Sequence, residues 1–210
     1  MSGKKNNIAL AFIIIITVAL PVLSIKATPG IQATQSGKPS VLTEDAIPFS
    51  VIKDGDIICR LGDRFWSNII KDVSITDKRF SHIGIIRIND GKITVINAEG
   101  DTDHGRDFVN EISMNEFLKH AVSAGIYRIN NIDGKFISEL AAEYLGVPFD
   151  WQFNMNDPSK LYCTELLYVI CKRMGLELDS IYVKELKNNA IPLESISGSK
   201  NFSEIYYVFR

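Results

Sequence analysis

Two β-rich runs joined by a tight turn are the feature of this 210-residue sequence that most constrains its fold. Residues 81–88 read SHIGIIRI, residues 92–98 read KITVINA, and an Asp-Gly pair stands between them at positions 90–91. β-branched residues favour extended backbone, and Asp-Gly favours the positive φ angles of a short hairpin turn. The sequence therefore predicts an antiparallel hairpin over residues 81–98.

The rest of the chain from position 46 contains further strand-like and helix-like segments. β-rich composition predicts strands, apolar residues at a spacing of three and four predict helices, and capping residues or glycines mark helix ends. These rules predict strands over 55–61, 125–129 and 202–209, and helices over 65–73, 113–120, 133–145 and 161–174. Antiparallel strands with helices segregated in sequence are typical of an α+β fold.

The first 27 residues have the pattern of an export signal. Lys4 and Lys5 precede an apolar run over residues 8–23, and a polar stretch follows. This order predicts a signal peptide over 1–27 with cleavage near Ala27. The alternative is an uncleaved anchor that keeps the protein near the membrane, because the run approaches the length of a spanning helix. Both predict an exported protein in the periplasm or cell envelope, secreted or anchored by its N-terminus.

Length and charge limit the kind of domain that the rest of the chain can form. A linker-like stretch over residues 28–45 leaves residues 46–210, which is enough chain for one domain and short for two. The net charge of −2 provides no basic field for nucleic acid. The cysteines and histidines lack the spacing of metal ligands, so we expect neither a metal nor a cofactor. We expect a monomer.

The three cysteines allow at most one internal disulfide. Cys163 and Cys171 are eight positions apart on one predicted helix, which separates them by about 12 Å along its axis. A disulfide needs α-carbons within about 7 Å, so these two residues cannot pair. Cys59 and Cys171 form a disulfide or are two buried apolar residues, and at least one thiol stays free.

Cys163 opens its predicted helix after a polar stretch that contains Pro158. Unpaired N–H groups and the positive end of the dipole stabilise an anion at a helix N-terminus. A thiol in this position is easier to ionise, and the thiolate is the nucleophilic form. The same N–H groups are donors for a developing oxyanion. The alternative for Cys163 is a small buried core residue.

His82 stands in front of an apolar strand that can hold its ring, whereas His104 is in a predicted loop and His120 is near a helix end. A thiol hydrolase needs a base near the sulfur and a third group that orients the imidazole. Glu99 ends the returning strand of the hairpin, so it is the expected third group, with His104 or Asp101 as alternatives. For His82 the alternative is a structural histidine.

Four short motifs in this order resemble the circularly permuted papain-like hydrolases, the YiiX/YaeF-like branch of the NlpC superfamily. They lie within residues 50–175 and are Gly55-Asp56-Ile57-Ile58, Ser81-His82-Ile83-Gly84-Ile85, Ala98-Glu99 and Tyr162-Cys163-Thr164-Glu165-Leu166. The resemblance implies a papain-like core with a central antiparallel sheet and a packed catalytic helix. It also implies that Cys163 is the nucleophile, His82 the base and Glu99 the orienting residue.

The resemblance also covers Tyr162, Asp56 and Glu165. Tyr162 precedes the nucleophile and either shapes the oxyanion site or pocket or packs in the core. Asp56 matches a Gly-Asp motif of the family, but we expect it to stabilise a turn or strand end. The charge of Glu165 is explained by its place at a helix start, without a catalytic role.

These residues together predict a cysteine hydrolase that cleaves an amide or ester bond through a thioester. The resemblance allows cell-wall peptides and N-acylated amines as substrates. Two alternatives stay open: a lipid-directed acyltransferase or thiol esterase similar to lecithin retinol acyltransferase, and a non-catalytic binding module on the same fold. Five aromatic residues either line an apolar groove or pack in the core: Phe65, Trp66, Phe149, Trp151 and Phe153.

Overall fold

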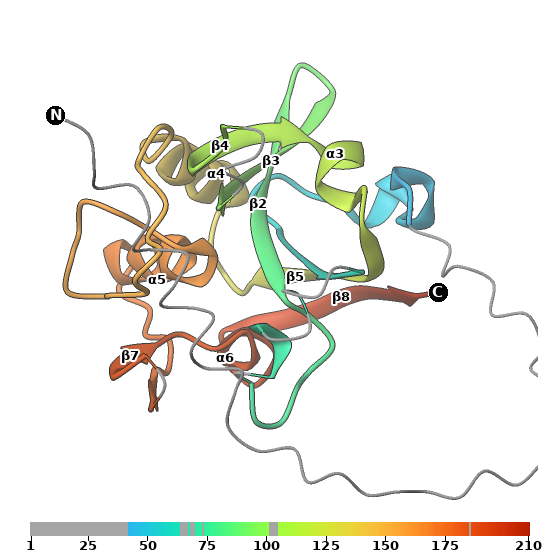
Figure 1. The fold of residues 1–210 in the computed structure, drawn as a ribbon. Coiled ribbons are helices and arrows are strands. Elements are labelled where there is room, and N and C mark those ends of the chain that lie inside the picture. Colours follow the sequence, from blue (N-terminus) through green and yellow to red (C-terminus); the bar gives the residue numbers. More distant parts are fainter. Residues whose placement is uncertain (1–41, 64–66, 68–69, 73, 101–104, 185) are drawn as a thin grey trace, which may run out of the picture. The chain divides into compact units, whose positions relative to one another are not determined.

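A six-stranded antiparallel sheet forms the centre of the fold (Figure 1). The computed structural model describes residues 42–210 apart from 64–66, 68–69, 73, 101–104 and 185. The strands of the sheet lie in the order β4-β3-β2-β1-β5-β8. Their bounds are β1 Ile57–Gly62, β2 His82–Asn89, β3 Lys92–Glu99, β4 Phe108–Ser113, β5 Ala121–Ile129 and β8 Phe202–Phe209, and a second, two-stranded sheet contains β6 Ile181–Val183 and β7 Asn188–Ala190.

The predicted hairpin is confirmed as β2 and β3. Asn89 pairs with Lys92 at its closed end. The two turn residues, Asp90 and Gly91, have φ angles of 49° and 76°. These positive angles are the ones that an Asp-Gly turn favours, so the local sequence determines this end of the hairpin.

The helices are short, and with the sheet they confirm an α+β fold. They are α3 Met114–Leu118, α4 Gly134–Ala142, α5 Cys163–Arg173 and α6 Glu194–Ser197. The Ser113 hydroxyl accepts the N–H of Glu116 at 3.2 Å, which confirms the predicted N-cap of α3. α5 begins two residues later than predicted, because Leu161 forms a β-bridge with Phe149. Most of the helix predicted over 65–73 lies outside the described residues.

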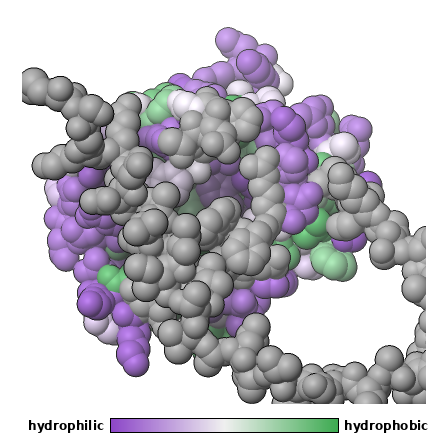
Figure 2. All heavy atoms as spheres, viewed as in Figure 1, coloured by the Kyte–Doolittle hydropathy of each residue, from purple (hydrophilic) through white to green (hydrophobic). Residues whose placement is uncertain are grey.

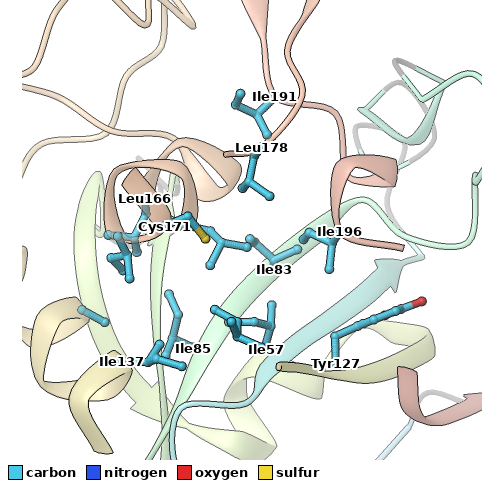
Figure 3. Close-up of a cluster of buried hydrophobic side chains, with 14 of the residues drawn as sticks. Ile57, Ile83, Ile85, Tyr127, Ile137, Leu166, Cys171, Leu178, Ile191 and Ile196 are labelled. Carbon is cyan, nitrogen blue, oxygen red and sulfur yellow. The ribbon is translucent and has the colours of Figure 1, made fainter. Parts of the chain in front are cut away.

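Apolar clusters cover both faces of the sheet. On one face, residues of α4 and α5 pack against β1, β2 and β3, and Figure 3 shows Cys171 of α5 near Ile83 and Leu166. On the other face, α3 contributes Met114 and Phe117 to a second cluster. Both clusters contain side chains of β2, which alternate between the two faces. The strand that begins with His82 is therefore held on both sides by packed core.

A buried ion pair fixes the start of β1. The Asp56 carboxylate, which is 1% exposed, accepts Nε and Nη2 of Arg128 at 2.7 Å each and the backbone N–H of Lys53 at 2.8 Å. All of these partners belong to the scaffold. The contacts agree with the structural role expected for Asp56 at a strand end.

The described chain is packed from its first residue. Leu42 is 2% exposed and donates its N–H to Ala121 at 2.8 Å. Residue 42, near the end of the 28–45 stretch predicted as a linker, is therefore part of the packed fold, and the predicted signal lies outside the described residues. Within the described part of the chain, no helix has the length and hydropathy to cross a membrane. The coloured surface in Figure 2 is mainly hydrophilic, with small hydrophobic areas.

Candidate active site

Cys163 is the first residue of α5 and the accessible cysteine of the described chain. Its side chain is partly exposed, whereas Cys59 and Cys171 are buried. All three thiols are free, so Cys59 and Cys171 are buried apolar residues rather than a disulfide. Cys163 is therefore the one of these three residues that is partly open to solvent.

The Cys163 thiol is protonated at neutral pH. Burial raises its pKa to about 11, while the N–H groups of Ile83 and Thr164 and the charge of Arg60 act in the opposite direction. The helix start therefore stabilises the thiolate as expected from the sequence, but loss of solvation outweighs that effect. The prediction of an easily ionised thiol does not hold for the resting protein.

The sulfur of Cys163 occupies a break in the sheet. Paired residues of β2 and β3 run from Asn89–Lys92 to Ile85–Ile96, although both strands continue further. Ile86 donates its N–H to Asp56 on the β1 side. Because backbone N–H groups alternate between the two sides of a strand, the N–H groups of Ile85 and Ile83 point away from β1, toward β3. Past the last paired residues, the N–H of Ile83 interacts with the Cys163 thiol. The catalytic candidate thus lies next to the residue that follows His82.

His82 begins β2 and its ring is held from two sides. Nε2 lies 2.9 Å from Oδ1 of Asn97, and the ring stacks on Phe117 with centroids 5.5 Å apart. Burial lowers the pKa of His82 to about 4, with a further decrease from the charge of Arg60. Glu99 and the bond to Asn97 raise it. At neutral pH the imidazole is therefore neutral and able to accept a proton.

Glu99, the expected third group, forms an ion pair with Arg60. Its carboxylate accepts Nη2 of Arg60 at 3.3 Å, and the Arg60 guanidinium lies 5.1 Å from the centre of the Phe117 ring. Among the described residues the hydrogen-bond partner of the His82 ring is Asn97, two residues before Glu99 on the same face of β3. Glu99 acts on the ring through its charge. The alternatives His104 and Asp101 lie outside the described residues.

Comparison with known proteins identifies the family. A family model for permuted papain-like amidases of the YaeF/YiiX type, family C92, matches residues 51–190. The chain belongs to this family. An uncharacterized YiiX protein of Escherichia coli K12 is 26% identical over 123 residues, which cover 55% of this chain and 55% of that protein. The match thus spans about half of the length of this relative.

A solved structure agrees with the fold of this permuted papain-like amidase. It is described as metalloprotein yiiX from Escherichia coli O157:H7 and superposes with a TM-score of 0.62 at 16% identity. The match covers 75% of this chain and 98% of the other. The family match and this likeness together confirm the predicted permuted papain-like fold. In the described part of this chain, no group of three or more His, Cys, Asp or Glu residues is arranged to hold a metal.

Tyr162 and its neighbour Thr164 connect the start of α5 to Ile191 by hydrogen bonds. Its hydroxyl accepts the N–H of Ile191 at 3.1 Å, and the Thr164 hydroxyl donates to the carbonyl of the same residue at 2.7 Å. The Tyr162 ring also contacts Phe153, with centroids 5.1 Å apart. These contacts fit the packing role that was one of the two expectations for Tyr162. A part in the oxyanion site stays a prediction.

Glu165 is buried one turn into α5 and acts as a cap. Its carboxylate accepts the backbone N–H of Tyr162 at 3.4 Å. Burial raises its pKa to about 7, with additional increases from Asp150 and Asp157. The bond to the N-cap residue is half of a capping box and stabilises the helix start, as expected for an acid at this position.

Aromatic rings extend from Tyr162 to the end of β3. Phe149 contacts Phe153 and Trp151, with centroids 6.3 and 5.0 Å apart. Gly100 follows Glu99, and a Cβ there would come within 2.8 Å of the Trp151 ring. Trp151 is 42% exposed. These rings therefore form an apolar border at the end of the strand that carries Asn97, whereas Phe65 and Trp66 lie outside the described residues.

Proposed function

We propose that this protein is an exported cysteine amidase in which Cys163 is the nucleophile and His82 the general base. The observation that carries the proposal is the free thiol of the partly exposed Cys163 at the start of α5, which interacts with the N–H of Ile83 at the open end of the β2–β3 hairpin. Membership of the permuted papain-like amidases supports hydrolysis by a cysteine. The signal-like pattern of residues 1–27 supports export.

The reaction starts from a neutral pair. The Cys163 sulfur attacks the carbonyl carbon of the substrate while its proton passes to Nδ1 of His82, the ring nitrogen that Asn97 does not hold. Backbone N–H groups at the start of α5 stabilise the oxyanion. The imidazolium then gives its proton to the leaving amine, and a thioester on Cys163 remains. Water that has lost a proton to His82 hydrolyses the thioester and restores the thiol.

Two nearby charges change the stability of the His82 imidazolium that forms during the reaction. Glu99 favours it and Arg60 disfavours it, and the two side chains form an ion pair with each other. Asn97 takes over the orienting role that the sequence assigned to Glu99, because its oxygen faces Nε2. An amide in this place orients the ring without adding a charge, so it raises the pKa of His82 less than a carboxylate would.

The substrate we favour is a cell-wall peptide or an N-acylated amine, bound by a monomer. One observation favours the alternative of a lipid-directed acyltransferase or thiol esterase. The partly exposed Trp151 and its neighbour Phe149 provide an apolar surface beside the end of β3, which suits an acyl chain. Both substrates react through the same thioester, so they differ in the group bound beside Trp151.

Purified exported domain incubated with a muropeptide panel and with N-acyl and ester lipids tests both classes. Cys163→Ala should abolish turnover of the active class while retaining the wild-type unfolding midpoint, and Cys171→Ala is the matched control that keeps activity. An alkylating acyl probe should label wild type and Cys171→Ala, but not Cys163→Ala. Full activity of Cys163→Ala would overturn the proposal. Absence of labelling and turnover would favour the non-catalytic binding module.

A further inference from the structure

We propose that Asn110 of β4 is a positioning residue that determines which ring nitrogen of His82 carries the proton. The inference rests on the proposed function for its catalytic meaning, but the position of the proton can be measured independently of activity. The feature behind it is a chain of buried amides that runs from His82 across β3 to β4. Asn110 does not touch the ring, so it acts through Asn97.

The chain consists of two amides and one backbone carbonyl. Nδ2 of Asn97 donates to Oδ1 of Asn110 at 2.9 Å, and Nδ2 of Asn110 reaches the carbonyl of Phe108 at 3.4 Å. Asn97 and Asn110 are directly paired residues of β3 and β4. They are 0% and 7% exposed. A buried amide needs partners for both ends, and the two side chains supply partners to each other.

The carbonyl of Phe108 gives the chain a direction. A carbonyl only accepts hydrogen bonds, so the amide nitrogen of Asn110 must face it and the amide oxygen must face Asn97. Asn97 then directs its nitrogen to Asn110 and its oxygen to His82. Reversing both amides would place the oxygen of Asn110 against that carbonyl and leave two buried acceptors facing each other. The contact between Asn110 and the Phe108 carbonyl in β4 therefore determines which way the amide of Asn97 is oriented.

The contact with the amide oxygen of Asn97 determines the tautomer of His82. Because Oδ1 of Asn97 faces Nε2, the neutral ring carries its proton on Nε2 and presents the lone pair of Nδ1. Nδ1 is the nitrogen that the proposed reaction needs as a base. The bond to Asn97 persists when the ring becomes an imidazolium, since Nε2 is protonated in both states. The charges of Arg60 and Glu99 change the amount of imidazolium, because the first lowers and the second raises the pKa of the ring.

Nitrogen NMR of protein labelled with ¹⁵N in its histidines measures the tautomer directly. The sequence has only three histidines, and the signals that His82→Gln removes identify the ring. In the wild type at neutral pH, His82 should show a protonated Nε2 and an unprotonated Nδ1. A proton on Nδ1 in the resting wild type would overturn the proposal, and this result depends neither on a variant nor on activity.

Two substitutions of Asn110 separate positioning from packing. Asn110→Leu removes the acceptor for Asn97, so His82 should become a mixture of tautomers and kcat should fall about 10-fold with KM unchanged. Asn110→Asp retains the acceptor for Asn97 and, when protonated, a donor for the Phe108 carbonyl, so it should keep more of the wild-type tautomer than Asn110→Leu does. The control is Asn189→Leu at an exposed site of β7, which should change neither. A wild-type tautomer in Asn110→Leu contradicts the proposal, and if that variant does not fold, Asn110→Ala is measured in the same way.

Failure of the positioning role can be distinguished from failure of the proposed function. The tautomer can be read in Cys163→Ala, which has no turnover under the proposed reaction. If Cys163→Ala proves active while the tautomer changes in Asn110→Leu, the assignment of the nucleophile fails and the positioning role of Asn110 stands. If the tautomer is unchanged in Asn110→Leu and Cys163→Ala is inactive, the positioning role of Asn110 fails and the assignment of Cys163 as the nucleophile stands.

Discussion

The two ends of the β2–β3 hairpin contain the same two strands and are built in different ways. At the closed end, Asn89 pairs with Lys92 around a turn whose φ angles suit Asp-Gly. At the open end, pairing stops at Ile85–Ile96, and the thiol of Cys163 interacts with the N–H of Ile83. The closed end is thus determined by adjacent residues. The open end is completed by α5, a helix that begins more than sixty positions after the end of β3.

This difference shows where reactivity arises in the sheet. A complete ladder satisfies every N–H and C=O group and leaves nothing for a ligand. Where the ladder stops, the Cys163 thiol meets the backbone N–H of Ile83, the residue that follows His82 in β2. Substitutions at the open end should therefore change activity, whereas a substitution at the closed end should change stability alone.

The largest effect is expected from His82→Gln at the open end. Loss of the base should lower kcat/KM by about 10³-fold, because general base catalysis contributes roughly this much. The unfolding midpoint should stay near that of the wild type, since Gln can still hydrogen-bond with Asn97. Steady-state kinetics and circular dichroism measure the two quantities. A decrease below about 10-fold would contradict the role of His82 as the base.

Asn97→Leu tests the orienting group next to it. The variant keeps the size of the side chain but removes the oxygen that faces Nε2 of His82, so kcat should fall by about 10²-fold. Glu99→Gln is the matched comparison on the same strand and should lower kcat less. If Glu99→Gln has the larger effect, the sequence-based assignment of Glu99 as the orienting residue is right.

The pH profile probes the charges at the open end. Neutral His82 is the active base, so kcat/KM should fall only when the pH decreases toward its lowered pKa of about 4. Arg60 contributes to that lowering, so Arg60→Met should raise the pKa and move the acid limb to higher pH. Arg87→Met is the control, because Arg87 pairs with Glu111 farther along β2. An acid limb unchanged by Arg60→Met would show that this charge does not act on the base.

The same lowered pKa affects stability. The unfolded chain binds a proton at His82 near its ordinary pKa of 6.5, whereas the folded protein does so only near 4. The unfolded state therefore binds more protons between these values, so the free energy of unfolding should decrease as the pH falls from about 6.5 to about 4. Urea titrations of wild type and His82→Gln measure this contribution, which should be absent from the variant.

The smallest effect is expected at the closed end. Gly91 has a positive φ and open space where a Cβ would lie, so Gly91→Ala costs only backbone strain. The free energy of unfolding should decrease by about 1 kcal/mol, while kcat/KM stays unchanged. Chemical denaturation and steady-state kinetics provide the test. A marked loss of activity would show that the two ends are coupled through the strands.

The sequence predicted what depends on neighbouring residues. The Asp-Gly hairpin, the Ser113 cap and the free Cys163 at a helix start are local patterns with direct physical causes. It did not predict Asn97, because an Asn in a strand has no pattern of its own, although its position two residues before Glu99 places both on one face. It also did not predict the raised pKa of the thiol. That effect depends on burial by residues far away in the chain.

The most direct test of the account is to trap the acyl-enzyme. The protein is mixed with an activated acyl ester, quenched in acid within the first turnover, digested and examined by mass spectrometry. We predict one added acyl group, on the peptide that contains Cys163, removable by hydroxylamine and absent from Cys163→Ala. Turnover of the ester with no acyl group on Cys163, or with the group on another residue, would contradict the claim that the thiol at the open end of the hairpin performs the reaction.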